Sequence, residues 1–311
     1  MHDSPPAPHV FAEVCDGAPS RLRIAVGIAT FGRPEVVSRA IAELAKQSRA
    51  PDLIVVSSPS YGDVAGLSND QRNTVVIVGQ NGLTNQRNSI LRSLENFDIV
   101  VFFDDDFVPC SRYIEEVEAI FLTHSDVVMT TGRVVADGIR TRGLSFEDAS
   151  ELLELDAHTQ VPALVTPVSN GYGCNMAIRL DPVFRNRIKF DENLPLYAWL
   201  EDVDFSRQLA RQGRIVKVTA TRGVHLGAKN GRQAGARLGY SQIANPVYLI
   251  KKGTCPLRHA VFLISRNLAA NAVRSFQPEP YVDRIGRLRG NMRALWDLVT
   301  GRIHPLRILQ L

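Results

Sequence analysis

Three consecutive carboxylates, Asp104, Asp105 and Asp106, directly follow the apolar run IVVFF at residues 99–103. Ionised carboxylates in such close positions repel one another, and a buried strand gains nothing by ending in them. A hard divalent cation would remove the repulsion, because Mg²⁺ and Mn²⁺ take oxygen ligands and keep coordination positions open for substrate phosphates. The triplet therefore predicts a metal site, and a solvated acidic turn is the alternative.

The sequence leaves two geometries open for this triplet. In an extended backbone alternate side chains share a face, so Asp104 and Asp106 would act together while Asp105 faces elsewhere. If the chain turns at once, Asp105 and Asp106 both reach the site. Asp106 belongs to the site in either geometry.

The elements that must position these carboxylates alternate between apolar runs and amphipathic segments. Hydrophobic periodicity predicts strands at residues 23–30, 52–57, 74–79, 99–103, 126–132 and 214–220. It predicts helices at residues 34–47, 83–97, 112–124 and 202–212. This alternation favours an α/β fold with a Rossmann-like, mostly parallel sheet covered by helices on both faces. Ligands of such sheets gather at the carboxyl ends of the strands, and the aspartates stand at one of those ends.

Length, net charge and cysteine spacing limit the classes of protein to which the chain can belong. The chain has 311 residues, 45% of them hydrophobic, which is enough for one large domain or two modest ones. A net charge of +4 is too small to indicate a nucleic-acid partner by itself. The four cysteines form no CxxC pair, so neither a disulfide framework nor a zinc site is expected, and a reducing cytoplasm fits. No stretch approaches the ~20 apolar residues that cross a bilayer, and residues 1–21 are predicted to be a flexible leader without a signal-peptide core.

The composition changes from about residue 256. Nine arginines accompany only three acidic residues in 256–311. Apolar residues recur there at alternating spacings of three and four, at Ile285, Leu288, Met292, Leu295 and Val299. This pattern predicts a basic helical extension whose apolar stripe packs on the rest of the protein, forms a homo-oligomer contact or lies on an anionic membrane. Nucleic-acid binding is not expected, because aromatic residues are not interleaved with the arginines.

Several blocks in a fixed order make the chain resemble the family-2 glycosyltransferases, which have the GT-A fold. FFDDDFVP is similar to the DxD motif of that family, and IATFGRP is similar to its opening nucleotide loop. GLTNQRNSIL is similar to a segment with an Arg-Asn pair near the nucleotide. GYGCNMAIR, followed by FDENLPLYAWLEDVDFSRQLARQG, is similar to the acceptor-side block that ends in a Glu-Asp motif. The resemblance covers roughly residues 22–250.

The resemblance implies a domain organisation. A GT-A domain would occupy residues 22–255, with a nucleotide-binding half at 22–132 and an acceptor half at 133–255. The flexible leader would precede this domain, and a basic helical extension at 256–311 would follow it.

The resemblance also implies roles for individual residues. The metal would be held by Asp104, Asp106 and His225, and the general base would be Asp202. The donor nucleotide would be bound by Thr30, Phe31, Arg33, Ser57, Asn81, Arg87, Asp104 and Asp105. The sugar or the acceptor would be contacted by Gly173, Asn175, Trp199 and Glu201. One departure concerns the nucleotide base: the second strand ends in Ser57-Ser58, where many UDP-sugar enzymes have an aspartate that reads uracil.

Structural roles are open for several of these residues. Glu201 and Asp202 could stabilise a helix N-terminus, where acidic residues are ordinary. His225 could be a structural histidine, and Arg87 could lie on the surface of a helix. Gly173 could be a plain turn residue, although glycine also permits close approach of the backbone to a sugar.

The chemistry of these residue types agrees with glycosyl transfer. A nucleotide-sugar donor needs Mn²⁺ or Mg²⁺ to neutralise the departing diphosphate, and the acceptor hydroxyl needs a base to take its proton. We expect a metal-dependent, inverting transfer of a hexosyl group to a saccharide or lipid-linked acceptor in the synthesis of a bacterial surface polysaccharide, such as an exopolysaccharide. The expected location is the cytoplasm, with peripheral contact to the anionic inner face of the cytoplasmic membrane.

Other functions fit fewer of the residues. A nucleotidyltransferase that makes sugar nucleotides normally has a Gly-rich loop with Arg or Lys after the first strand, and ATFGRP has one glycine and no lysine. A non-catalytic, membrane-associated subunit of a polysaccharide assembly complex would be expected to lack the metal and base carboxylates, which are present. A phosphatase of the haloacid-dehalogenase type would carry its nucleophile on the first strand, which has none.

Overall fold

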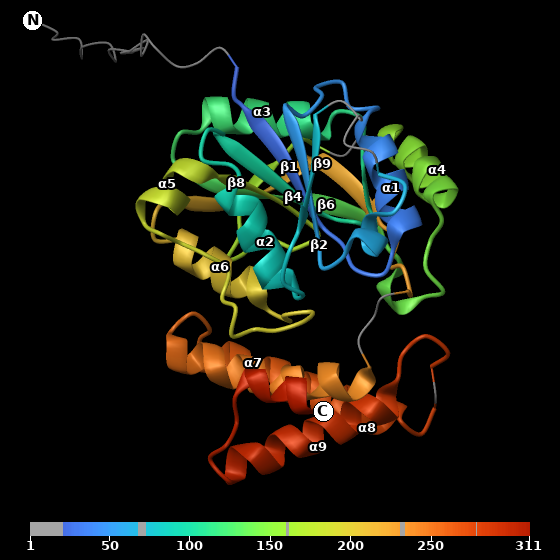
Figure 1. Cartoon of the computed structure of the whole chain (residues 1–311), viewed down its shortest axis with the longest axis vertical. Helices are drawn as coiled ribbons and strands as arrows, with labels where there is room; N and C mark the ends of the chain where they lie inside the picture. Colours follow the sequence, from blue (N-terminus) through green and yellow to red (C-terminus); the bar gives the residue numbers. More distant parts are fainter. Residues whose placement is uncertain (1–20, 68–72, 160–161, 231–233, 278) are drawn as a thin grey trace, which may run out of the picture.

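An α/β domain and a group of C-terminal helices make up the part of the chain that the computed structural model describes (Figure 1). The described residues are 21–67, 73–159, 162–230, 234–277 and 279–311. The predicted leader, 1–21, lies outside them except for Arg21.

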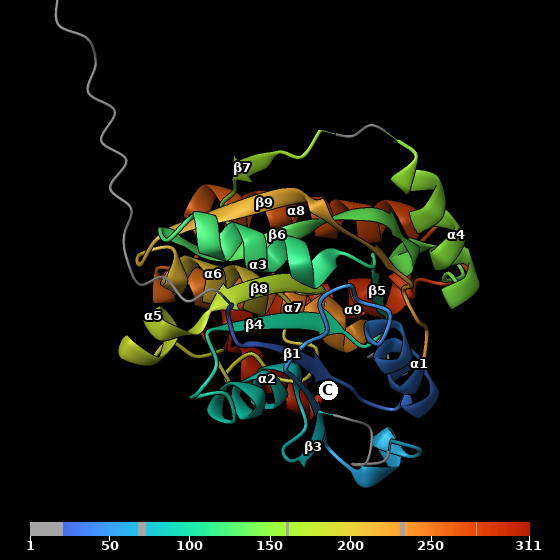
Figure 2. The same ribbon diagram turned by 90° about the horizontal axis from the view of Figure 1, so that it is seen from above.

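The strands of the described residues form a nine-stranded sheet. Its order is β3-β2-β1-β4-β8-β6-β9-β5, with β7 paired to β9, and Figure 2 shows most of this order from β9 to β3. The strands are β1 (Ile24–Ala29), β2 (Leu53–Ser58), β3 (Thr74–Val78), β4 (Ile99–Asp104), β5 (Phe107–Pro109), β6 (Val127–Asp137), β7 (Val165–Pro167), β8 (Asn175–Arg179) and β9 (Arg214–His225).

The helices lie between and after these strands. The α-helices are α1 (Pro34–Leu44), α2 (Leu83–Arg92), α3 (Tyr113–Thr123), α4 (Phe146–Ala157), α5 (Leu180–Arg185), α6 (Glu201–Leu209), α7 (Gly235–Lys252), α8 (Leu257–Arg274) and α9 (Arg284–Val299). Short 3₁₀ helices are η1 (Tyr61–Val64), η2 (Gly138–Arg140) and η3 (Pro305–Gln310).

The parallel strands β3, β2, β1 and β4 bring predicted site residues to one edge of the sheet. In the strand register Ala29 lies opposite both Ser57 of β2 and Asp104 of β4. Because these strands run in the same direction, the loops that follow β1, β2 and β4 leave the sheet at the same edge. This is the edge at which ligands of α/β sheets bind.

Alternating side chains of the central strands build two apolar layers. Val26 and Phe103 belong to a buried cluster with residues of α1 and α3, whereas Ala25 and Phe102 belong to a cluster with residues of α2 and α6. A strand covered on both faces must be apolar on both, which is why these strands are continuous apolar runs in the sequence. The predicted α/β fold with helices on both faces of the sheet is confirmed.

Several boundaries differ from the predicted ones. The helix predicted at 83–97 ends at Arg92, while β6 continues to Asp137 and β9 continues to His225. β6 and β9 pair in parallel along this length, and register shifts absorb their irregular spacing. His225 is therefore the last residue of β9, held in the sheet opposite Phe107 of β5.

Helices α7, α8 and α9 pack against one another and are called the helical unit below. The predicted domain boundary at 255/256 falls between α7 and α8, two helices in mutual contact. α9 contacts α7 through glycines: a Cβ on Gly239 would lie 2.0 Å from the Arg287 carbonyl oxygen, and one on Gly290 would lie 2.0 Å from the Ala236 carbonyl oxygen. The two backbones come this close because no side chain separates them. Within the described residues, no helix has the length and apolar character needed to span a membrane.

Gly290→Ala is expected to destabilise the folded protein by about 1–3 kcal/mol, because the new methyl group would overlap the backbone of α7 and force the helices apart. At an exposed helical position the same change would stabilise by up to about 1 kcal/mol, since alanine favours a helix more than glycine does. Thermal and urea unfolding measure the difference. Gly62→Ala is the control, because its Cβ would make an ordinary contact of 3.5 Å with Ser60 Oγ. A raised or unchanged midpoint for Gly290→Ala would contradict the close packing.

Candidate active site

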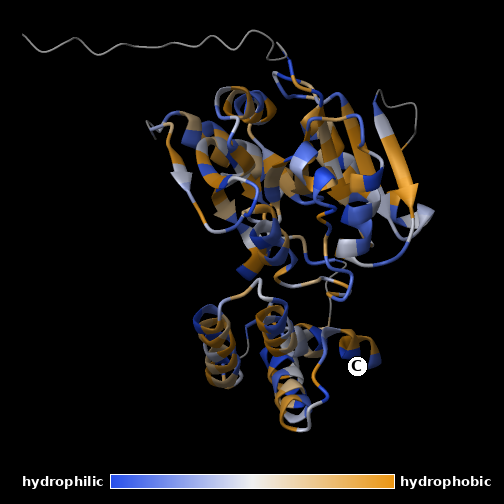
Figure 3. Cartoon of the chain, turned by 90° about the vertical axis from the view of Figure 1, so that its left-hand side faces the viewer, coloured by the Kyte–Doolittle hydropathy of each residue, from blue (hydrophilic) through white to orange (hydrophobic). Residues whose placement is uncertain are grey.

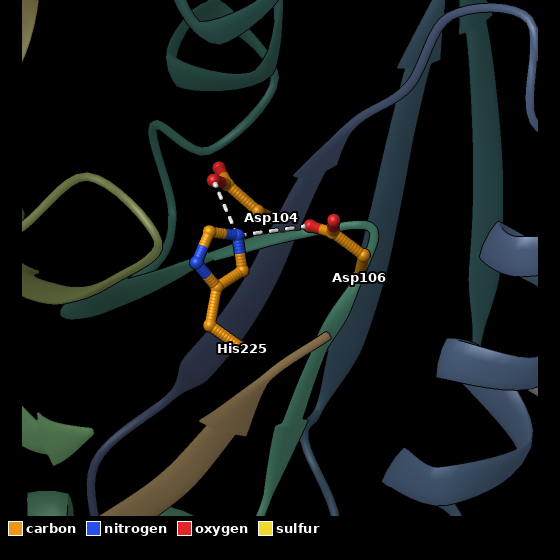
Figure 4. A group of neighbouring side chains, drawn as sticks. All are labelled: Asp104, Asp106 and His225. Atoms are coloured by element: carbon orange, nitrogen blue, oxygen red, sulfur yellow. Dashed lines mark ion pairs between the residues drawn. The ribbon is translucent and has the colours of Figure 1, made fainter. Parts of the chain in front are cut away.

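Two side chains of the aspartate triplet and one from a distant part of the sequence meet at the carboxyl edge of the sheet (Figure 4). Asp104 ends β4, Asp106 lies in the turn that follows, and His225 ends β9. One ligand atom from each residue lies within 4.8 Å of the others. His225 Nε2 is 3.2 Å from an Asp106 oxygen and 3.9 Å from an Asp104 oxygen. Two carboxylates and an imidazole form a donor set suited to a divalent cation such as Mn²⁺.

Asp105 points away from this cluster and toward the loop after β1. Its Oδ2 accepts a hydrogen bond from Thr30 Oγ1 at 2.6 Å, and its Oδ1 lies 3.2 Å from Arg33 Nη1. The same Arg33 nitrogen lies 3.3 Å from Asp106 Oδ2. Of the two geometries that the sequence leaves open, the structure has Asp104 and Asp106 together and Asp105 apart, even though the chain turns at Asp105 and Asp106.

Burial and neighbouring charges set the protonation of the triplet. Burial raises the pKa of Asp105 to about 7, with the Arg33 guanidinium opposing the shift. Burial would also raise the pKa of Asp106, but the hydrogen bond and charge of His225 outweigh it and hold that pKa below its usual range. Burial lowers the pKa of His225, whereas Asp106 and Asp137 raise it more strongly, to about 10. The proton on His225 thus supplies positive charge among the carboxylates, and a divalent cation would supply it at the same place.

A buried arginine links this cluster to helix α6. Arg87 of α2 donates hydrogen bonds to Glu201 Oε1 at 2.5 Å, to the Gly173 carbonyl oxygen at 2.7 Å and to Asp104 Oδ1 at 3.2 Å. Burial raises the pKa of Glu201 to about 8, with the Arg87 guanidinium opposing the shift. Arg87 is 1% exposed, so it is not a surface residue of its helix. Its guanidinium makes hydrogen bonds to protein groups.

Asp202, the second residue of α6, lies beside this arginine. Its Oδ2 accepts a hydrogen bond from the Gly173 amide at 3.1 Å, and its Oδ1 accepts one from the Val203 amide at 2.8 Å. Burial raises the pKa of Asp202, although these two hydrogen bonds lower it. Each carboxylate oxygen has a second lone pair, so Asp202 retains the capacity to accept a proton.

Gly173 lies where a side chain would collide with this arrangement. A Cβ at this position would lie 3.0 Å from Glu201 Oε1 and 3.4 Å from Arg87 Nη1. The backbone of Gly173 contacts Asp202 through its amide and Arg87 through its carbonyl oxygen. The glycine is therefore required by close approach of its backbone to the charged groups.

The loop before α6 has an unusual backbone. Leu196, Ala198 and Leu200 have φ values of 61°, 53° and 73°, a left-handed conformation that costs a non-glycine residue on the order of 1 kcal/mol or more. The helical unit holds this loop, because Ala198 packs in a buried cluster with Leu249 of α7. Such strain persists only where the surrounding structure fixes it.

α7 and the residues just after it also fix α6 and the loop before it by polar contacts. Asn245 donates a hydrogen bond to the Trp199 carbonyl oxygen at 2.8 Å. Asp204 is fully buried and accepts hydrogen bonds from Lys252 and Thr254, each at 2.7 Å. Asp204 therefore anchors α6 to the helical unit rather than facing the site.

The structure places the other predicted residues at different depths. Phe31 is 45% exposed and Asn81 is exposed, so both are open to a ligand. Trp199 is half-buried. Ser57 and Asn175 are fully buried, and their side chains lie behind the site rather than at its surface.

Two further residues fix the segments that follow β1 and β2. Gln86 Nε2 donates hydrogen bonds to the carbonyl oxygens of Thr30 at 2.8 Å and Ser57 at 2.7 Å, which ties the ends of β1 and β2 together. Asp63 of η1 accepts a hydrogen bond from the Gly32 amide at 2.7 Å. Sequence analysis missed both. Gln86 could have been found from its place next to Arg87 in GLTNQRNSIL, whereas Asp63 has no motif around it.

Asp137, at the end of β6, is a third residue that sequence analysis missed. Its Oδ1 lies 3.2 Å from His225 Nδ1, and its Oδ2 accepts a hydrogen bond from the Tyr172 hydroxyl at 3.2 Å. A carboxylate behind the second ring nitrogen orients a metal-ligating histidine and fixes its protonation. Its place was hidden because β6 extends beyond its predicted end at residue 132.

Comparison with known proteins assigns the family. The profile of the family described as Glycosyltransferase like family 2 matches residues 20–224, more than half of the chain. The chain belongs to this family. The predicted resemblance is confirmed, and the family-2 glycosyltransferase described here is a transferase enzyme. A search of curated proteins found no match.

Solved structures share the fold of this family-2 glycosyltransferase. The mannosyltransferase PcManGT from Pyrobaculum calidifontis, in complex with GDP-Man and Mn²⁺, has a TM-score of 0.57 at 14% identity, covering 90% of this chain and 89% of that one. S. aureus TarS 1-349 in complex with UDP-GlcNAc has a TM-score of 0.55 at 14% identity, covering 92% and 83%. GalNAc-T7 with UDP, GalNAc and Mn²⁺ has a TM-score of 0.54 at 13% identity, covering 91% of this chain but only 59% of its own. The predicted GT-A fold is confirmed.

Proposed function

We propose that the enzyme transfers a hexosyl group from a nucleotide-diphosphate donor to a hydroxyl of a saccharide or lipid-linked acceptor, with inversion at the anomeric carbon. The observation that carries this proposal is the convergence of two groups on one edge of the sheet: the cluster of Asp104, Asp106 and His225, and the carboxylate of Asp202. The first group suits a diphosphate neutralised by a cation, and the second suits the proton of a hydroxyl. Sugar transfer needs both.

Different residues would act on the donor and on the acceptor. Asp104, Asp106 and His225 would hold Mn²⁺ or Mg²⁺, which when bound neutralises charge on the departing diphosphate. Asp202 would accept the proton of the acceptor hydroxyl as that oxygen attacks the anomeric carbon. Arg87 and Glu201 keep the two halves in a fixed relation. Inversion is expected because direct displacement brings the hydroxyl to the face opposite the leaving group.

A separate question is which nucleotide base the donor carries. PcManGT was solved with GDP-Man, whereas TarS was solved with UDP-GlcNAc and GalNAc-T7 with UDP. In this chain β2 ends in Ser57 and Ser58, both fully buried. Neither serine offers an exposed side chain to a base, so direct measurement must identify it.

A panel of nucleoside diphosphates tests the proposal. With Mn²⁺ present, we expect one diphosphate to raise the melting temperature by several degrees, because a ligand at 100 times its dissociation constant stabilises by ~2.7 kcal/mol. The shift should vanish in EDTA. The matching sugar nucleotide should then release its diphosphate when acceptor is added. If no diphosphate shifts the transition with either Mn²⁺ or Mg²⁺, the proposed donor class is wrong.

The proposed setting is the synthesis of a bacterial surface polysaccharide at the inner face of the cytoplasmic membrane. The basic character of the C-terminal helices supports it, because anionic lipids attract clustered arginines. The two alternatives, sugar-nucleotide synthesis and a non-catalytic subunit, are weakened by the family and by the complete set of carboxylates.

A further inference from the structure

The outer faces of α8 and α9 carry large apolar side chains in contact with solvent. On α9, Met292, Trp296 and Val299 follow one another at helical spacing, and Trp296 is 58% exposed. On α8, Phe262 and Val273 are exposed in the same way, and Phe276 is exposed just after the helix ends. Exposed apolar groups gathered on one face of an element mark a surface that another body covers.

Packing within the chain does not account for the apolar stripe of α9. Ile285, Met292 and Val299 of the predicted stripe face outward. α9 instead turns Gly290 and Ala294, both buried, toward α7. The expectation that the stripe packs on the rest of the protein is therefore wrong for these three residues, because the close approach of Gly290 to the α7 backbone turns another side of α9 inward, with Asn291 and Asp297 also buried on α9.

Arginines alternate with the exposed apolar side chains. Arg289 and Arg293 of α9 are exposed, as are Arg258 and Arg266 of α8. The acidic residue of α9, Asp297, is 1% exposed: it accepts hydrogen bonds from Tyr240 and Arg307 and lies 3.7 Å from Arg293. The two outer faces are thus both apolar and positively charged.

We propose that these outer faces of α8 and α9, called the lipid-facing surface, bind an anionic lipid bilayer. Anionic headgroups complement the arginines, and the boundary of the acyl chains accepts the apolar side chains. Trp296 suits this boundary, since tryptophan concentrates at membrane interfaces. A second copy of the chain complements the surface poorly, because a two-fold contact would place arginines of one copy against those of the other.

The helical unit separates this surface from the catalytic domain. α7 lies between the α/β domain and α9, and the three helices form a layer at one end of the molecule (Figures 1 and 3). The loop that precedes Asp202 packs on α7, so the acceptor side of the site adjoins the attached layer. The inference that a lipid-linked acceptor reaches Asp202 from this layer rests on the proposed function. The attachment of the lipid-facing surface to a bilayer does not.

Co-sedimentation of the full chain with vesicles tests the proposal. We expect binding to vesicles that contain phosphatidylglycerol and none to vesicles of phosphatidylcholine alone. Binding should be lost at about 1 M salt, where the Debye length falls to about 3 Å. Arg289→Glu/Arg293→Glu should weaken binding roughly 30-fold or more, because each arginine near anionic lipid contributes about fivefold.

Matched variants separate this surface from a general effect of charge or hydrophobicity. Met292→Ser/Trp296→Ser should also weaken binding at least tenfold. Arg92→Glu/Arg211→Glu and Leu155→Ser change exposed residues elsewhere and should bind as the unaltered chain does. Asp106→Ala should keep vesicle binding, and the α9 variants should keep transfer to a water-soluble acceptor, so failure of attachment and failure of the reaction are distinguished. Equal binding by all variants, no binding to anionic vesicles, or a dimer that the α9 variants dissociate would overturn the proposal.

Discussion

Asp106→Ala is expected to abolish metal-dependent binding of the nucleoside diphosphate. The change removes one of the two carboxylates of the cluster and leaves Asp104 and His225 alone. Removal of a direct metal ligand should lower the affinity for the metal by more than the roughly 10–100-fold that follows removal of a hydrogen-bond partner of such a ligand. Titration calorimetry with Mn²⁺ and the diphosphate selected by the panel measures the affinity.

Two controls keep this result interpretable. Asp106 Oδ2 accepts a hydrogen bond from the Ala228 amide at 2.7 Å, so the alanine variant also loses a local contact. Asp106→Asn keeps the shape and one acceptor oxygen, and it should fold normally while still binding metal poorly. Asp181→Ala changes an exposed aspartate of α5 and should leave affinity unchanged. Diphosphate affinity that is equal with Mn²⁺ and with EDTA in the unaltered chain would show that the cluster does not act through a metal.

The parallel part of the fold and the carboxylate cluster were predictable because their signals are local. β4 is a run of apolar residues that ends in Asp104, and its neighbour β1 is another such run. In a sheet covered on both faces, the length of the run determines where the strand ends. Residues just after it then lie at the ligand-binding edge without any knowledge of the rest of the chain.

Contacts between distant segments were not predictable from these signals. The partner of Arg87, Glu201, lies 114 residues away along the chain. The local sequence around Arg87 is a polar helix, which equally fits a surface position or a nucleotide contact. Only the fold shows that the guanidinium is buried between two carboxylates.

The orientation of α9 shows how a correct pattern can lead to a wrong inner face. Hydrophobic periodicity favours burial of the apolar stripe. The contact of Gly290 with the α7 backbone instead buries a side of α9 that has small residues together with the polar Asn291 and Asp297. Periodicity shows where apolar residues lie on a helix. It does not show whether they pack on the same chain or face outward.

Asp202→Asn is expected to lower turnover by roughly 10² to 10⁴, while donor binding stays nearly normal. The amide keeps the shape of the side chain but cannot take up the proton of the acceptor hydroxyl. Donor affinity should be spared, because the cation cluster and Asp202 are separate groups. Steady-state rates at saturating donor and Mn²⁺, with diphosphate affinity measured in parallel, test both statements.

Asp204→Asn is the control that distinguishes a catalytic general base from an acidic residue that only stabilises the fold. Asp204 is two residues further along α6, fully buried and bonded to Lys252 and Thr254. We expect this variant to lose thermal stability but to keep most of its rate per folded molecule. If Asp202→Asn behaves like Asp204→Asn, the base lies elsewhere and Asp202 only stabilises the start of its helix.

The pH profile gives a second, independent signature of Asp202. Because burial raises its pKa, the acid limb of turnover should lie above the ordinary range of an aspartate. A base must be ionised to act, so the rate should fall as pH is lowered through this raised pKa and should not recover below it. In Asp202→Asn the residual rate should lose this limb. A limb that persists unchanged in the variant would assign it to another group, because an amide does not titrate.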